Sequence, residues 1–203
     1  MDSLTKTKRT KGPLVTAKNT LLVKILKESV KILIAASIIS SIGGIGFEAF
    51  KLKIVALLPL VIMMPALNDM IGDFGTIISS KFTMLLYQKK IHKKWWDSFE
   101  LGDQFRIIST IALFAAFYLG ILSVVIAHIR GAAISAIGAL KVIAIAFMST
   151  AILVLVIFFL AIVGGIWVYK RGKDPNNFLI PITTSVADFS SLILFSLMVA
   201  FLF

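Results

Sequence analysis

Cysteine is absent from this 203-residue sequence, and charged residues make up only 15% of it. The absence of cysteine excludes disulfides, thiol catalysis and cysteine-ligated metal sites. The charged fraction lies well below the roughly 25% that is usual for soluble domains. Hydrophobic residues make up 59%, which is more apolar surface than a soluble domain of this size can bury. The composition therefore predicts an integral membrane protein whose main solvent is the lipid bilayer.

Signatures of catalysis and of nucleotide binding are also scarce. The two histidines, His92 and His128, do not have the spacing of a metal-binding pair. No Gly-x-Ser-x-Gly elbow is present, so the sequence does not indicate a serine hydrolase of that type. Gly131, Gly138 and the Gly164–Gly165 pair are predicted to allow close helix packing rather than nucleotide binding, because no strand precedes them. No prosthetic group is expected.

Five apolar stretches are long enough to cross the hydrocarbon core, which takes about 20 residues of helix. They predict an all-α, multi-pass fold with five transmembrane helices. The second stretch contains Pro59 and Pro65 and would extend about 51 Å as one helix. It is therefore predicted to be bent or broken, with an inner end that leaves the membrane. The stretches are Ile32–Phe50, Ile54–Tyr87, Ile107–Ile129, Val142–Tyr169 and Phe178–Phe203.

The formal net charge of +11 comes from basic residues that cluster between the apolar stretches. Fifteen lysine and arginine residues fall in the N-terminal tail and in the connections after the second and fourth stretches, against three on the opposite side. Because positive residues accumulate on the cytoplasmic side of membrane proteins, a cytoplasmic N-terminus and an outside C-terminus are predicted. The plasma membrane is the expected location. The same clustering argues against a nucleic-acid partner, which binds a basic face or stripe.

The N-terminal tail, residues 1–27, is predicted to be cytoplasmic, and residues 28–203 to form the transmembrane module. The alternation of apolar and basic residues in the tail is typical of an amphipathic helix at the membrane surface. A simple extension of the first transmembrane helix explains the pattern equally well. In either case the tail has no room for a soluble regulatory domain. The apolar residues are Leu21, Leu22, Ile25 and Leu26, and they alternate with Lys24, Lys27 and the acidic Glu28.

Three of the ten acidic residues, Asp69, Asp73 and Asp188, lie inside apolar stretches. A carboxylate within a membrane span is costly and usually faces a cavity or the bundle interior. Asp69 and Asp73 are four residues apart, so they share one helical face. Counted from Phe178, Asp188 lies about 15 Å from the cytoplasmic face, close to the midplane. Counted from Ile54, Asp69 lies about 22 Å from the outer face, and so in the inner half.

Polar residues recur at intervals of three or four along the fifth stretch, as expected of a helix that lines a wet path. Asp174 stands before this stretch, at the predicted inner mouth. Together with Asp69 and Asp73, these residues predict a line of carboxylates that runs from the midplane to the cytoplasm. These polar residues are Asn177, directly before the stretch, and Thr184, Asp188 and Ser191 within it, with Pro181 among them.

Carboxylate, hydroxyl and amide oxygens suit a hard cation, because magnesium takes oxygen ligands and keeps several of its waters. Manganese and calcium accept the same ligands, and the composition does not separate a cation path from a proton relay. The structural alternative is a set of buried acids that pair with Lys81 or with backbone groups.

Two segments of the sequence resemble the MgtE magnesium transporters and their eukaryotic solute-carrier relatives. The run from Asp174-Pro175 to Asp188 is similar to the family's last helix, in which an aspartate fourteen positions after that of the Asp-Pro pair is the central magnesium ligand. The run from Pro65 through Gly72-Asp73 to Ser80-Lys81 resembles the second helix, with an ending closer to the solute-carrier branch. The resemblance covers about residues 28–203, one module of five helices.

The resemblance implies a homodimer in the lipid bilayer that moves magnesium, or the related manganese or calcium ions, between or beside two modules. Asp188 would hold the hydrated cation, and Asp174 would collect or release it at the mouth. Asp73 departs from the family, which usually has asparagine at that place. Coupling to sodium or protons, the direction of flux and the choice between channel and exchanger stay open. The residues predicted to serve the cation are Asp188, Asp69, Asp73, Asp174, Thr184, Ser185, Asn68 and Asn177.

Two other functions fit parts of the sequence. Pro65-Ala66-Leu67 and Gly72-Asp73 superficially resemble the signatures of intramembrane aspartyl proteases, in which two carboxylates share a proton. Met70 stands where the first glycine of that signature belongs, and the Pro-Ala-Leu precedes the aspartate instead of following it on a later helix. A non-transporting membrane scaffold explains the apolar helices but gives no reason for the carboxylates. The sequence therefore predicts a transporter and not an enzyme.

Overall fold

The computed structural model describes residues 13–91 and 98–203, with side-chain surroundings from residue 30 onwards. Helices make up nearly all of these ranges, and no strand occurs in them, which confirms the predicted all-α fold. Five of the helices in these ranges are long and apolar enough to cross a membrane, as predicted. The helices are α1 (Pro13–Glu48), α2 (Lys51–Val55), α3 (Leu58–Tyr87), α4 (Phe99–Ile129), α5 (Ala136–Lys170) and α6 (Pro175–Leu202).

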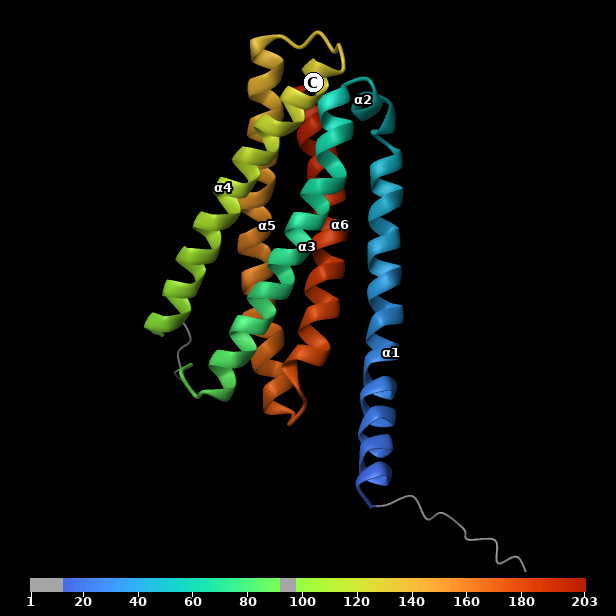
Figure 1. The fold of residues 1–203 in the computed structure, drawn as a ribbon, viewed down its shortest axis with the longest axis vertical. Coiled ribbons are helices and arrows are strands. Elements are labelled where there is room, and N and C mark those ends of the chain that lie inside the picture. Colours follow the sequence, from blue (N-terminus) through green and yellow to red (C-terminus); the bar gives the residue numbers. More distant parts are fainter. Residues whose placement is uncertain (1–12, 92–97) are drawn as a thin grey trace, which may run out of the picture.

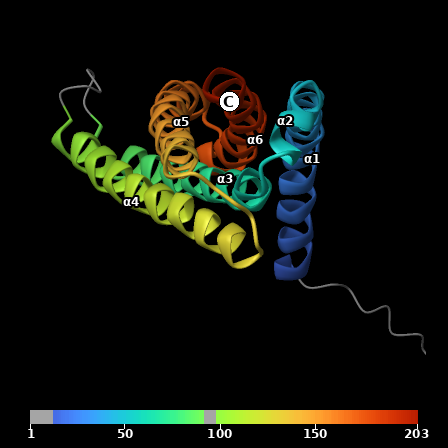
Figure 2. The ribbon, with the colours of Figure 1, turned by 90° about the horizontal axis from the view of Figure 1, so that it is seen from above.

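The long helices run side by side along the length of the molecule (Figure 1). Three of them, α3, α5 and α6, pack on one another, and α4 packs against α3 and α5. The view from above shows α1 at one edge of the bundle and α4 at the other (Figure 2). α1 packs chiefly against α6. Because α6 contacts both α1 and α3, side chains along α6 can meet partners from the first and the third helix.

The second apolar stretch, predicted to be bent or broken, is broken near its start, where its first two residues, Ile54 and Val55, belong to α2. α2 ends at Val55, and α3 begins at Leu58 and continues through Pro65 to Tyr87. Pro59 lies in the first turn of α3, where its missing N–H removes no helical hydrogen bond. The predicted break therefore lies before Pro59, and the long helix begins four residues later than the sequence indicated.

α1 is one helix from Pro13 to Glu48, so the helix continues from the basic tail into the first span. The part that is long and apolar enough to cross a membrane is Val30–Glu48. The position of the tail at the membrane surface stays a prediction, as does the boundary between residues 1–27 and 28–203.

Glycine allows close contact between α5 and its neighbours. A Cβ on Gly165 would lie 2.6 Å from the ring of Phe82 on α3, so the packing role predicted for the Gly164–Gly165 pair is confirmed. The same prediction is wrong for Gly131 and Gly138, which lie at helix ends. Gly131 has a φ of +85° and open space around it, a backbone conformation that glycine adopts without steric cost. The N–H of Gly138 donates to the hydroxyl that caps α5.

Gly43 sets the contact between α1 and α6. A Cβ on Gly43 would lie 2.8 Å from the Cα atom of Phe189, whereas a Cβ on Gly44 would meet nothing within 4 Å. Because the obstructing atom belongs to the backbone, Gly43→Ala is expected to push the two helices apart and to lower the free energy of unfolding by about 1–3 kcal/mol. Thermal unfolding in detergent measures this loss, with Gly44→Ala as the matched control. Equal unfolding midpoints for the two variants would contradict the prediction.

Candidate functional site

Asp188 of α6 lies where α1, α3 and α6 meet. Its Oδ1 accepts a hydrogen bond from Nδ2 of Asn68 on α3 at 3.0 Å, and its Oδ2 accepts one from Oγ of Ser40 on α1 at 3.2 Å. The side chain is half-buried. Each carboxylate oxygen thus has one donor and keeps further acceptor capacity. The carboxylate is held in place by two helices and can still bind a cation.

The amide of Asn68 is oriented by a second contact. Ser191 on α6 donates a hydrogen bond from its hydroxyl to Oδ1 of Asn68, and the same hydroxyl lies 3.0 Å from the carbonyl oxygen of Asp188. With its oxygen bound to a hydroxyl, the amide presents its NH₂ group to the carboxylate. Asn68 therefore orients Asp188 from the neighbouring helix.

Thr184 and Ser185 share a pocket with Asp188, as the helical spacing predicts. The pocket has a volume of about 350 Å³. The hydroxyl of Thr184 donates to the carbonyl of Ile180 at 2.9 Å, and that of Ser185 donates to the carbonyl of Pro181 at 2.6 Å. Since the protons serve the helix backbone, the hydroxyl oxygens remain available as acceptors or cation ligands. The lining residues are Leu33, Ala36, Ser37, Ser40, Pro181, Thr184, Ser185 and Asp188.

Asp174 and Asn177 lie together in a second pocket, of about 390 Å³, at the N-terminal end of α6. Asp174 caps this helix, because its Oδ1 accepts a hydrogen bond from the N–H of Asn176 at 3.0 Å. Pro181 lacks the N–H that would bond the carbonyl of Asn177 within the helix. That carbonyl is thus a further oxygen near the pocket.

Asp69 and Asp73 lie on an outward face of α3, away from this group. Both residues are exposed, and neither forms a hydrogen bond or an ion pair within residues 30–91 and 98–203. Lys81 is exposed and unpaired in the same ranges, so the alternative in which it neutralises buried acids is not found in the described part of the chain. No three acidic or histidine side chains in that part form a metal-binding group. The predicted line of carboxylates is not formed within these ranges.

The depth predicted for Asp69 also changes. Because α3 begins at Leu58, Asp69 lies about 16 Å along the helix from that end, instead of about 22 Å. Its neighbour Asn68 contacts Asp188, and a Cβ on Gly72 would lie 3.9 Å from Oδ1 of Asp188. Asp69 and Asp73 therefore flank the level of Asp188 and do not continue a path from it towards Asp174.

Ser40 was not singled out from the sequence. Ser37, Ser40 and Ser41 interrupt the first apolar stretch, and this group of hydroxyls was the available signal. In the structure Ser37 and Ser41 donate to carbonyl oxygens one turn earlier in α1, and Ser40 reaches Asp188 on α6. The first helix thus contributes a donor to the site.

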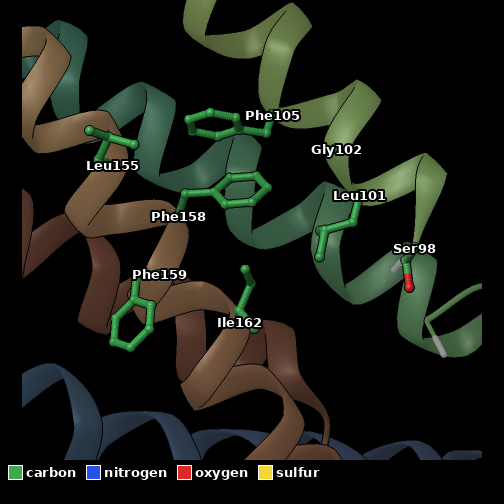
Figure 3. A pocket seen from close by; sticks show the side chains of 8 residues that line it. All are labelled: Ser98, Leu101, Gly102, Phe105, Leu155, Phe158, Phe159 and Ile162. Carbon is green, nitrogen blue, oxygen red and sulfur yellow. The ribbon is translucent and has the colours of Figure 1, made fainter. Parts of the chain in front are cut away.

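A different pocket, of about 330 Å³, lies between α4 and α5 (Figure 3). Its lining side chains are apolar except for that of Ser98, and they include Phe105, Phe158 and Phe159. Such a lining has no carboxylate for a cation. The candidate site is therefore the one around Asp188.

Comparison with protein families matches residues 64–198 to the MgtE family, described as a divalent cation transporter. This span includes most of α3, all of α4 and α5, and α6 as far as Met198. It contains every residue that the sequence predicts for the path. No curated protein and no solved structure matches the chain.

Proposed function

Because the chain belongs to the MgtE family of divalent cation transporters, we propose that it moves magnesium through a carboxylate-lined path in a homodimer. It is a multi-pass membrane protein and a transporter, not an enzyme. The protease alternative is therefore set aside. The transported ion is a divalent cation; magnesium as that ion, the path and the homodimer are our proposal.

The geometry of Asp188 is the observation that carries the proposal. An intramembrane carboxylate is costly, yet this one is held by two hydrogen bonds from separate helices and opens onto a pocket of about 350 Å³. Six waters occupy roughly 180 Å³ at about 30 Å³ each, so the pocket has room for a cation with its hydration shell. Magnesium dehydrates reluctantly and is commonly held by one or two carboxylates through its waters. This match favours magnesium over ions that need a tight, fully protein-made cage.

The homodimer is supported by the exposed acids of α3. Asp69 and Asp73 lie near the level of Asp188 with no described partner, on a helix that is apolar enough to span the membrane. Carboxylates at that depth do not face lipid, since hydrocarbon solvates charge poorly. A second copy of the chain that covers this face of α3 would place both acids on a wet path between the copies. The N-terminus in the cytoplasm and the plasma membrane as location complete the proposal.

Flux into liposomes tests the proposal. The purified chain is reconstituted around a magnesium-sensitive dye, and influx of magnesium, manganese and calcium is compared with that into protein-free liposomes. Influx should be fastest for magnesium. Imposed sodium and proton gradients distinguish the mechanisms, because only a coupled exchanger responds to them with net magnesium movement against its own gradient. A membrane scaffold would leave the rates for all three ions at the protein-free level.

Cross-linking tests the dimer. Because the chain has no cysteine, one introduced cysteine reports on one position. Ile77 is an exposed residue on the same face of α3 as Asp73, so Ile77→Cys is expected to give mostly covalent dimer in liposomes after mild oxidation. Phe114→Cys on α4, which is even more exposed than Ile77, serves as the control and should stay monomeric. Similar dimer yields from the two variants would count against an interface at α3.

A further inference from the structure

α1 and α6 are close at one end and separate towards the other. Near Gly43 and Gly46 of α1, added Cβ atoms would lie within about 3 Å of Phe189 and Ile193 on α6. Towards the N-terminal end of α6, the two helices are instead separated by the pocket of Asp188 and then by that of Asp174. Figure 1 shows the lower half of α1 standing apart from the bundle. The two pockets thus follow one another along α1 and α6, and Val168 of α5 also lines the pocket of Asp174.

The lining of the Asp174 pocket carries more positive than negative charge. Lys31 of α1 and Lys173, just before α6, line it together with Asp174 and Asn177. All three charged residues are exposed, and none forms an ion pair with a described residue. Two ammonium groups and one carboxylate therefore line the Asp174 pocket, which is next to the pocket of Asp188.

Lys31 is placed to act on an ion that passes between the two pockets. Lys31 and Ile32 line the pocket of Asp174, and the next residue, Leu33, lines the pocket of Asp188. On α6, Asn177 and Phe178 line the pocket of Asp174, and Pro181, one turn further along, lines the pocket of Asp188. A cation that moves between Asp174 and Asp188 along this groove passes the ammonium group of Lys31.

Resting on the proposed transport function, we propose that Lys31 is a tethered cation that competes with the divalent ion for the mouth of the path. Its side chain lines the same pocket as Asp174 without pairing with that carboxylate, so its positive charge faces the space that an ion must enter. An entering ion must displace this ammonium group, and the repulsion scales with the ion's double charge. Lys31 therefore sets the apparent affinity of the Asp174 pocket for the divalent ion. In this way α1 regulates entry to a path whose ligands lie mainly on α6.

Lys31→Gln separates this role from a structural one. At low ionic strength the variant is expected to lower the apparent KM for magnesium influx about three- to tenfold, the size of the effect of one charge on a divalent ion about 8 Å away in water. The maximal rate should stay unchanged. The difference should shrink in about 0.5 M salt, because salt screens exposed charges. Lys31→Arg keeps the charge and should behave as the unmodified chain. Lys53→Gln is the control, because Lys53 is an exposed lysine of α2, beside the N-terminal end of α3 and away from the Asp174 pocket. This variant should leave the KM unchanged.

The outcomes are distinct for the two proposals. Unmodified protein that moves no divalent cation overturns the transport function and this inference with it. Normal flux in the unmodified protein with an unchanged KM in Lys31→Gln overturns only the role of Lys31. A KM change that is equally large in Lys53→Gln, or that persists in high salt, overturns it as well, because neither result is expected from a local charge.

Discussion

Asp188→Asn is expected to reduce magnesium flux by a factor of about a hundred or more. Loss of a group that merely supports a metal ligand already costs about 10–100-fold in affinity or activity, and here the charged group itself is removed. The amide has nearly the same shape as the carboxylate, and its single oxygen can keep one of the two hydrogen bonds from Asn68 and Ser40. What disappears is the negative charge that makes a cation stable at this depth. Initial rates of magnesium influx into liposomes measure the effect.

Stability separates loss of function from loss of fold in this variant. Removing a half-buried charge removes a desolvation cost, so the unfolding temperature of Asp188→Asn in detergent should equal or exceed that of the unmodified chain. Asp103→Asn is the control, since Asp103 pairs with Arg106 on the exposed surface of α4 and should leave flux unchanged. Asp188→Asn with a flux within about twofold of normal would place the ion path elsewhere.

The residues that share one face of a helix were predictable from the sequence. Thr184 and Ser185 precede Asp188 by four and three residues, so helical periodicity alone places all three on one face. The shared pocket agrees with that prediction. The number of spans was predictable for a similar reason, because the length of an apolar run that crosses the bilayer is fixed by its thickness.

Contacts between side chains of different helices were not predictable in the same way. Ser40 and Asp188 are 148 residues apart in the chain, and a serine in a helix can satisfy itself on its own backbone, as Ser37 does. The contact exists because Gly43 lets α1 approach Phe189 of α6. Such an approach depends on which helices meet, which the spacing within either helix does not specify.

The choice between Asn68 and Asp69 shows the same limit. Neighbouring residues point about 100° apart on a helix, and both of these are polar, so the pattern does not say which one faces α6. Small residues decide it. Gly75 and Ser79 lie on the same stripe as Asn68 and contact Thr183 of α6, with the two hydroxyls of Ser79 and Thr183 2.8 Å apart. This close packing turns Asn68 inwards and leaves Asp69 on the outer face.

Replacing both outward acids, Asp69→Asn with Asp73→Asn, is expected to lower magnesium flux by about tenfold or more. In the proposed dimer two copies would bring four carboxylates to the covered face of α3, near the level of each Asp188. Their combined negative potential would raise the local concentration of a doubly charged cation, an effect that reaches 10–1,000-fold in charged clefts. Flux of a monovalent ion, if any, should fall less, because its attraction to each carboxylate is half as large. The ratio of magnesium to potassium influx measures this difference.

Glu48→Gln is the matched control for these acids, because Glu48 is exposed at the end of α1 and already pairs with Lys51. Dimer cross-linking through Ile77→Cys should persist in the Asp69 and Asp73 variant, since asparagine leaves the shape of the interface intact. Reduced flux with intact cross-linking would place these acids on the ion path. Unchanged flux with intact cross-linking would mean that the second copy covers the acids without using them, and the path would then follow the groove between α1 and α6 alone. Asp69 and Asp73 lie on the face of α3 that the second copy would cover, whereas Asp188 lies in the pocket between α1 and α6, so replacing Asp69 and Asp73 affects only the route between the copies.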